Sequence, residues 1–177
     1  MSYAIPTDIP QVVVTWLEWP LAERLRAAFL RDDAPVWSRL AAVAISLNEQ
    51  PGKIPNGNCC GIMSQGRTMP WGWREKHWQR VKPVGYALIR EGQGGLLAPF
   101  LAFAQPADSL SFLIDRVWTR RIWTGEDYAA EWVSINVPAS DGFKSAAAAY
   151  ERAYDKAVAA LWAMARRGED VPRTGDA

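Results

Sequence analysis

Residues 35–63 read PVWSRLAAVAISLNEQPGKIPNGNCCGIM and contain the features that decide the expected fold. Apolar side chains recur through the first half with the spacing of a helix, and Pro35 suits the first turn of that helix. Pro51 and Gly52 end the helix directly after Glu49. The segment therefore predicts a buried helix whose last residue is a carboxylate, followed by a loop rich in glycine, proline and asparagine.

The rest of the chain predicts a mostly helical α+β domain with one small β-hairpin. Apolar residues recur at helical spacing in three further segments, and two short alternating runs flank a glycine-rich turn. The expected elements are helices over residues 20–31, 108–121 and 144–166, a short helix after a Thr124–Asp127 capping box, a hairpin over residues 83–104 and a loop over residues 50–82. We expect a single domain over residues 1–166 and a polar C-terminal tail over residues 167–177.

Composition excludes several classes of protein. The 20 Lys and Arg residues nearly balance the 19 Asp and Glu residues, so no strong overall field favours nucleic acid as a partner. No apolar run approaches the ~20 residues that span a bilayer, and the N-terminal residues do not resemble a signal peptide. Cys59 and Cys60 are expected to be reduced thiols because neighbours form only a strained disulfide. With His77 as the single histidine, neither a metal site nor a cofactor is expected.

Glu49 is the residue from which a function can be argued. The negative end of a helix and nearby apolar groups both favour the protonated form of a carboxyl group. A carboxylic acid that keeps its proton near neutral pH is what glycosidic cleavage needs to protonate the leaving oxygen. The alternative interpretation is a solvated glutamate at a helix end.

The segment AVAISLNEQPGKIPNGNCCGIM, residues 42–63, resembles the core of the glucosaminidase domains of peptidoglycan hydrolases in the lysozyme-like superfamily. In that family a helix ends on the catalytic glutamate, and an Asn-x-x-Gly-Ile type segment follows, here Glu49 and residues 58–62. Further on, RIWTGEDYAAEW at residues 121–132 is similar to the Tyr-rich stretch before the final helices of the family. The resemblance extends over residues 35–136.

The resemblance implies a lysozyme-like domain with a small β-hairpin beside an active-site cleft. The implied activity is cleavage of the β-1,4-linked GlcNAc/MurNAc glycan of bacterial peptidoglycan with Glu49 as general acid. The enzyme would be a glycoside hydrolase of N-acetylglucosaminidase or muramidase type, or a lytic transglycosylase. In the family the hairpin bears a second acidic residue, and Glu91 stands at that place here.

Glu91 is therefore the candidate for the second carboxylate that most glycosidases use. The alternative is a glutamate on a surface turn. Asp127 is the next candidate, although its place in the capping box already explains it, and Asp115 fits a solvated helix face. If no second carboxylate meets Glu49, a lytic transglycosylase becomes the natural interpretation, because the sugar itself then completes the chemistry.

Aromatic and polar residues around these carboxylates are candidates for substrate binding. Tryptophan is unusually frequent, with ten residues, and sugar faces stack on such rings. The candidates are Gln65, Trp71, Trp73, Tyr86, Trp123 and Tyr128. For the tryptophans and tyrosines the alternative role is packing within the domain.

Two other classes of function compete with the enzyme. Gln50-Pro51-Gly52-Lys53 stands where the family has Ser-Gly-Trp-Gly, which favours a catalytically altered or inactive glycan-binding or structural module, such as a phage virion component. The basic and aromatic segment at residues 67–82 would suit a nucleic-acid binder, against which the near-zero net charge argues. Without a signal peptide, an endolysin-like enzyme would reach the periplasm or cell wall through a phage or secretion-system partner.

Overall fold

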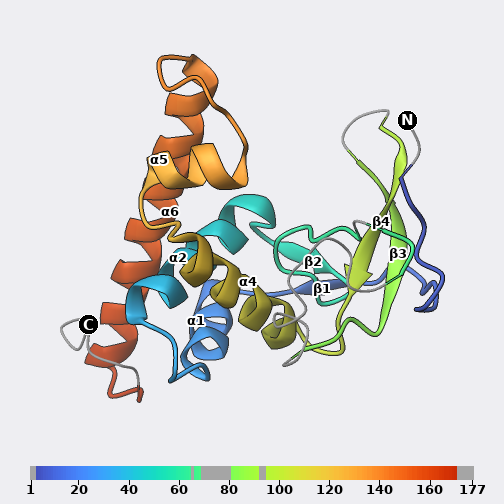
Figure 1. The fold of residues 1–177 in the computed structure, drawn as a ribbon. Coiled ribbons are helices and arrows are strands. Elements are labelled where there is room, and N and C mark those ends of the chain that lie inside the picture. The colour runs from blue at the N-terminus through green and yellow to red at the C-terminus, as the bar shows by residue number, and fades with distance from the viewer. Residues whose placement is uncertain (1–2, 65, 69–80, 92–94, 171–177) are drawn as a thin grey trace.

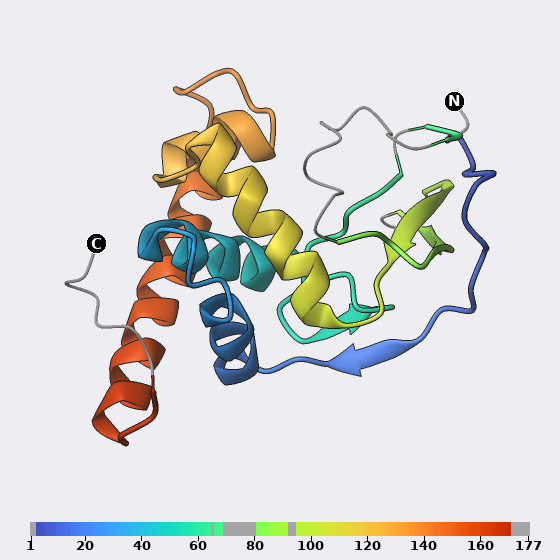
Figure 2. The same cartoon turned by 60° about the horizontal axis from the view of Figure 1, so that its bottom comes forward.

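The elements of the chain form an α+β arrangement in the computed structural model, which describes residues 3–64, 66–68, 81–91 and 95–170. In chain order they are β1 (Trp16–Glu18), α1 (Leu21–Phe29), α2 (Val36–Glu49), β2 (Lys53–Pro55), β3 (Gly85–Arg90), β4 (Leu97–Ala102), α4 (Pro106–Arg120), α5 (Gly125–Asp127), η1 (Tyr128–Trp132) and α6 (Asp141–Arg166). Figures 1 and 2 show the helices gathered in one part of the molecule and the two small sheets in the other, with α2 ending toward the sheets. The predicted α+β class is therefore confirmed.

Helix α2 is the centre of the core. Ten of its 14 residues are buried, and it packs against α1, α4 and α6. A helix that is apolar on all sides is stable only when it is covered on all sides, and the alanines at residues 41, 42 and 44 let the neighbouring helices approach closely. The predicted buried helix is confirmed, and its rigid packing supports the residue at its end, Glu49.

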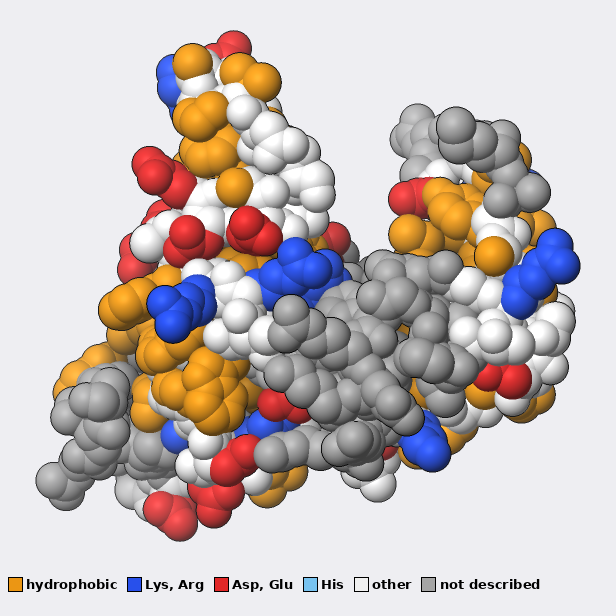
Figure 3. All heavy atoms as spheres, viewed as in Figure 1, with side chains coloured by type: hydrophobic (Ala, Val, Ile, Leu, Met, Phe, Trp, Pro, Cys, Tyr) orange, Lys and Arg blue, Asp and Glu red, His pale blue; other side chains and the backbone are white. Residues whose placement is uncertain are grey.

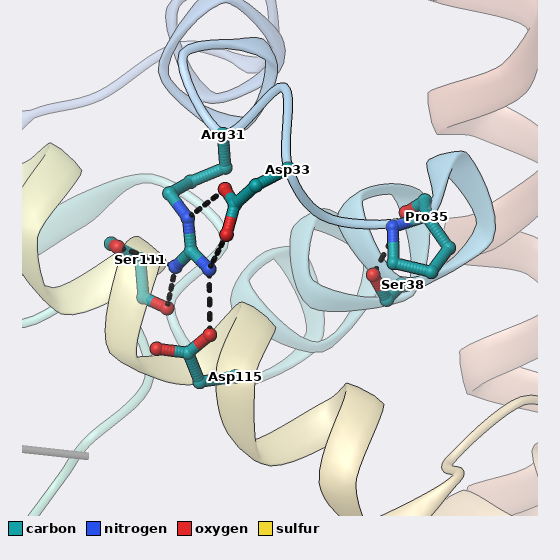
Figure 4. Close-up of polar contacts among 6 residues, drawn as sticks. All are labelled: Arg31, Asp33, Pro35, Ser38, Ser111 and Asp115. Atoms are coloured by element: carbon teal, nitrogen blue, oxygen red, sulfur yellow. Dashed lines mark hydrogen bonds and ion pairs between the residues drawn. The ribbon is translucent and has the colours of Figure 1, made fainter. Parts of the chain in front are cut away.

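A network around Arg31 ties the α1–α2 connection to α4 (Figure 4). The Arg31 guanidinium donates to Asp33 at 2.8 Å, to Asp115 at 2.6 Å and to the Ser111 hydroxyl at 2.7 Å. Burial acts to lower the pKa of Arg31, but the bonds with the two carboxylates outweigh it and raise that pKa above its usual value. Arg31 therefore stays charged and links the α1–α2 connection to α4. Asp115, expected on a solvated helix face, instead lies in this network.

The two sheets are small and antiparallel. β3 pairs with β4 from Gly85 opposite Ala102 to Arg90 opposite Leu97, which confirms the predicted hairpin. β1 pairs with β2, and this sheet was not predicted, because residues 50–82 were expected to be loop. Each of its strands has only three residues, too few for an alternating pattern to appear in the sequence.

The helix boundaries follow local signals. Thr124 Oγ1 accepts from the Asp127 N–H at 3.1 Å and Asp127 Oδ2 accepts from the Thr124 N–H at 2.8 Å, so the predicted capping box is confirmed. α6 begins three residues before the predicted start because the Ser140 hydroxyl caps it. α4 begins at Pro106, two residues early, since proline suits a first turn. In the described part of the chain, no helix is both long and apolar enough to cross a membrane.

Candidate active site

A cleft of about 690 Å³ contains both carboxylates that the sequence singled out. Glu49 enters it from the end of α2, and Glu91 enters it from the end of β3. Figure 3 shows the molecule hollowed between the helical part and the β3–β4 hairpin. The two carboxylates thus come from separate elements and line one space.

The end of α2 is fixed by a buried arginine. The guanidinium of Arg24, which has no exposed surface, donates to the carbonyls of Trp19 at 2.7 Å, Ser46 at 2.9 Å and Gly52 at 3.3 Å. Burial lowers the pKa of Arg24 below its usual value. Because Ser46 and Gly52 lie on either side of Glu49 in the sequence, Arg24 holds both the last helical turn and the turn that follows.

The loop after α2 forms a tight floor, as predicted. The Asn58 amide donates to the carbonyls of Ile62 at 2.8 Å and Leu101 at 2.9 Å, and its oxygen accepts from the Ile62 N–H at 2.9 Å. The Ser46 hydroxyl donates to the Cys59 carbonyl at 2.9 Å. These bonds fasten the loop to β4 on one side and to α2 on the other.

Cys59 and Cys60 are free and buried, as predicted. Cys60 lines the cleft beside Glu49. Burial, followed by the neighbouring Cys59, raises the pKa of the Cys60 thiol well above its usual value. A neutral buried thiol is a small packing residue, so Cys60 contributes to the floor and not to nucleophilic chemistry.

Two donors hold one oxygen of the Glu49 carboxyl group. The Tyr128 hydroxyl donates to Oε1 at 2.8 Å, and the Trp132 indole N–H donates to the same atom at 3.2 Å. Burial, then the charge of Glu49, raises the pKa of Tyr128, so its hydroxyl remains a donor. Oε1 accepts both of these bonds, and Oε2 takes part in neither of them. The Glu49 residue as a whole is exposed, although the sequence predicted that apolar groups would surround it, and it lines the open cleft.

Arg116 supplies a positive charge to the same cleft. Its guanidinium lies over the Trp132 ring, 4.4 Å from the ring centroid, and the residue lines the cleft. Burial lowers the pKa of Arg116 to about 10. Arg116 is therefore still a cation at neutral pH, in the same cleft as the Glu49 carboxyl group and able to attract an anionic group of a ligand.

Glu91 is held by the N-terminal segment. The Tyr3 hydroxyl donates to Glu91 Oε2, and both residues line the cleft. This hydrogen bond raises the pKa of Tyr3. The segment reaches Glu91 because it pairs with β3, where the Val12 N–H donates to the Tyr86 carbonyl at 2.8 Å and the Tyr86 N–H donates to the Pro10 carbonyl at 3.0 Å.

The remaining predicted residues have different places. Tyr86 is buried in β3, while Trp123 is 62 % exposed and lines a separate hollow. Gln65, Trp71 and Trp73 lie outside the described residues.

The cleft also contains side chains that the sequence did not indicate, among them Tyr3, Arg116 and Trp132. Only Trp132 left a signal, because it stands four residues after Tyr128 and so falls on the same side of a helix. Arg116 and Tyr3 reach the cleft from segments that are far from Glu49 in the sequence.

A metal is not suggested by the described residues, among which no group of three His, Cys, Asp or Glu side chains converges. Neither a protein-family model, nor a curated protein, nor a solved structure matches this chain. The function is therefore argued from the cleft itself.

Proposed function

We propose that the protein is a glycosidase that cleaves the glycan strands of peptidoglycan, with Glu49 as general acid and Glu91 as the second carboxylate. The observation that carries the proposal is the presence of both side chains in one cleft of about 690 Å³. Glycoside cleavage commonly needs a pair of carboxyl groups that flank the scissile bond. Glu49 at a helix end and Glu91 at a hairpin end come from separate elements, so they can lie on two sides of a bound glycan and take the two different roles.

The two hydrogen bonds to Glu49 fix the orientation of its carboxyl group, which the role of the acid requires. With Oε1 occupied by the donors of Tyr128 and Trp132, Oε2 would carry the proton and deliver it to the glycosidic oxygen as the C–O bond breaks. Glu91 would take a proton from a water molecule that adds to the anomeric carbon. The two products are then a shortened glycan with a reducing end and a fragment with a free hydroxyl group.

The lining of the cleft supports a sugar substrate that carries carboxylates. Phe100 and the exposed Val133 offer apolar surface for the C–H faces of sugar rings, and Trp132 adds an aromatic ring. Arg116 offers a cation to a lactyl or peptide carboxylate. The β-1,4-linked GlcNAc/MurNAc strand implied by the sequence resemblance has both properties.

The test is the clearing of purified peptidoglycan by the wild type and by the Glu49→Gln and Glu91→Gln variants. Loss of a general acid typically lowers a rate by about 10²–10⁴-fold, so clearing by Glu49→Gln should fall at least a hundredfold. Glu126→Gln is the matched control, because Glu126 is an exposed glutamate on α5 and does not line the cleft. Mass spectrometry then identifies the ends of the released fragments.

The fragments separate the candidate reactions. Reducing ends, with both cleft variants inactive, support hydrolysis by two carboxylates. Anhydro-sugar ends, with Glu91→Gln still active, would replace the proposal by a lytic transglycosylase that uses Glu49 alone. Absence of clearing by the wild type on several wall types would overturn the enzymatic proposal and leave a glycan-binding or structural module.

A further inference from the structure

A second hollow, of about 510 Å³, lies at the other end of α2 from Glu49. Its lining residues are Trp37, Trp118, Thr119, Arg121 and Trp123. Among the residues that the structure describes, none lines both this hollow and the cleft that contains the carboxylates. Glu49 stands twelve positions after Trp37 in this helix, which corresponds to roughly 18 Å along the helix axis. The two hollows are therefore separate features that lie along one rigid element.

Three tryptophans expose indole surface around this hollow. The rings of Trp37 and Trp123 stack with centroids 5.7 Å apart and an angle of 28° between their planes. Trp123 is 62 % exposed and Trp118 is 41 % exposed. Large aromatic surfaces left in water usually mark a place where a ligand or partner binds.

The exposed Trp123 ring is carried by a rigid backbone. The backbone N–H of Trp123 donates to Asp127 Oδ2 at 3.0 Å. The backbone carbonyl of Trp123 accepts from the buried Tyr150 hydroxyl at 3.2 Å. The preceding residue, Ile122, is fully buried. A loop anchored on both sides of an exposed indole presents that ring in a fixed position, which reduces the entropy lost on binding.

Arg121 gives the hollow its charge. It follows the last turn of α4 in the left-handed conformation, with φ 52°. The Arg121 N–H bonds to the Trp118 carbonyl and the Ile122 N–H bonds to the Val117 carbonyl, the pattern in which glycine is preferred at this position. An arginine here adds a cation to a hollow whose described lining residues include no carboxylate.

The charge and the rings together define the ligand. A cage of aromatic rings can bind a quaternary ammonium group, but a neighbouring guanidinium repels such a cation. A pyranose ring fits better, because it stacks a C–H face on an indole and leaves its polar edge to water. A carboxylate on that sugar would pair with Arg121.

We propose that this hollow is a second carbohydrate-binding site, in which a sugar ring stacks on Trp123 and a sugar-linked carboxylate pairs with Arg121. The carbohydrate class follows from the hollow itself, whereas the choice of peptidoglycan as the polymer rests on the proposed function. The site holds a glycan strand at one end of α2 while the carboxylate cleft acts at the other end.

The experiment measures co-sedimentation of the protein with insoluble peptidoglycan and with chitin, an uncharged polymer of N-acetylglucosamine. All proteins carry Glu49→Gln, so that bound polymer is not cleaved. Trp123→Ala should lower binding to both polymers at least fivefold, whereas Arg121→Gly should lower binding to peptidoglycan alone. Trp162→Ala is the matched control, because Trp162 is a 51 % exposed tryptophan on α6 outside the hollow, and it should bind normally.

The outcomes separate this inference from the proposed function. Trp123-dependent sedimentation supports the second site even if the wild type clears no peptidoglycan. Equal sedimentation of Trp123→Ala and Trp162→Ala would overturn the inference even if Glu49-dependent clearing is observed. Trp123-dependent binding of a single-stranded oligonucleotide with no binding of either glycan would also overturn it, since bases stack on the same rings. Arg121→Gly should melt no lower than its parent, which excludes unfolding as the cause of lost binding.

Discussion

Replacing Arg24 by methionine should destabilise the fold far more than replacing Arg26, which lies on the same helix. Arg24 is fully buried and bonds to three carbonyls and one hydroxyl, whereas the Arg26 side chain is 55 % exposed and pairs with Glu169 at the surface. Methionine keeps most of the side-chain volume and removes every donor. The comparison therefore isolates the hydrogen bonds that fix the end of α2.

The size of the effect follows from which acceptors lose their donor. The Ser46 carbonyl keeps the Gln50 N–H at 2.9 Å and the Gly52 carbonyl keeps the Trp19 N–H at 3.3 Å. The Trp19 carbonyl loses its 2.7 Å bond, and a buried acceptor without a donor costs about 1–3 kcal/mol. Loss of the charge-assisted hydrogen bonds to the other acceptors adds to this cost. Removal of the buried charge offsets part of the cost, because its desolvation penalty is removed too. We expect Arg24→Met to lower the free energy of unfolding by about 2–4 kcal/mol.

The assay is urea unfolding followed by far-UV circular dichroism, with both variants compared with the wild type. Arg26→Met should change the midpoint little, because exposed ion pairs contribute little to stability. The slope of the free energy against urea should be the same in all three proteins if only stability changes. Equal midpoints for Arg24→Met and Arg26→Met would refute the role given to the buried guanidinium.

Three further results are expected. Gly125→Ala should lower the free energy of unfolding by about 1–3 kcal/mol in thermal unfolding, because the added Cβ would lie 2.4 Å from the Ala147 carbonyl oxygen. Gly52→Ala is the control and should be neutral, since its added Cβ would have no atom within 4 Å. Iodoacetamide at mildly alkaline pH should label the buried Cys59–Cys60 pair only after unfolding, and rapid labelling of the native protein would contradict the described burial. Tyr128→Phe removes a hydrogen-bond donor to Glu49 and should slow peptidoglycan clearing about tenfold. The melting temperature should change by no more than a few degrees. Unchanged clearing would exclude this contact from catalysis.

Local patterns in the sequence were sufficient for the helical part of the fold. The Pro51 and Gly52 stop signal, the capping box at Thr124 and the apolar run of α2 each act within a few residues, so each could be recognised without the partner segments. The β1–β2 sheet could not be recognised in this way, because Leu17 pairs with Ile54 across a long stretch of chain. Pairing between distant short strands leaves no local signal.

The candidate site was predictable only in part for the same reason. Glu49 and Glu91 stood out because a helix stop and a glycine-rich turn mark their positions. In the sequence Arg24 resembles an ordinary polar residue of an amphipathic helix. Nothing in the residues next to it predicts a fully buried guanidinium. Trp123 was grouped with the catalytic cleft, yet its stacking partner, Trp37, comes from a helix start 86 residues earlier.

The contact between Tyr3 and Glu91 has a consequence for how the protein folds. It joins residues 88 positions apart, so the hairpin wall of the cleft is complete only after a long loop has closed. Helices α1 and α2 are neighbours in the chain and can pack together through much shorter loops, so the hairpin wall should form after this helix pair. Detachment of residues 3–12 from β3 would likewise open the cleft while the helices stay folded, and faster amide exchange at Val12 than in α2 would reveal it.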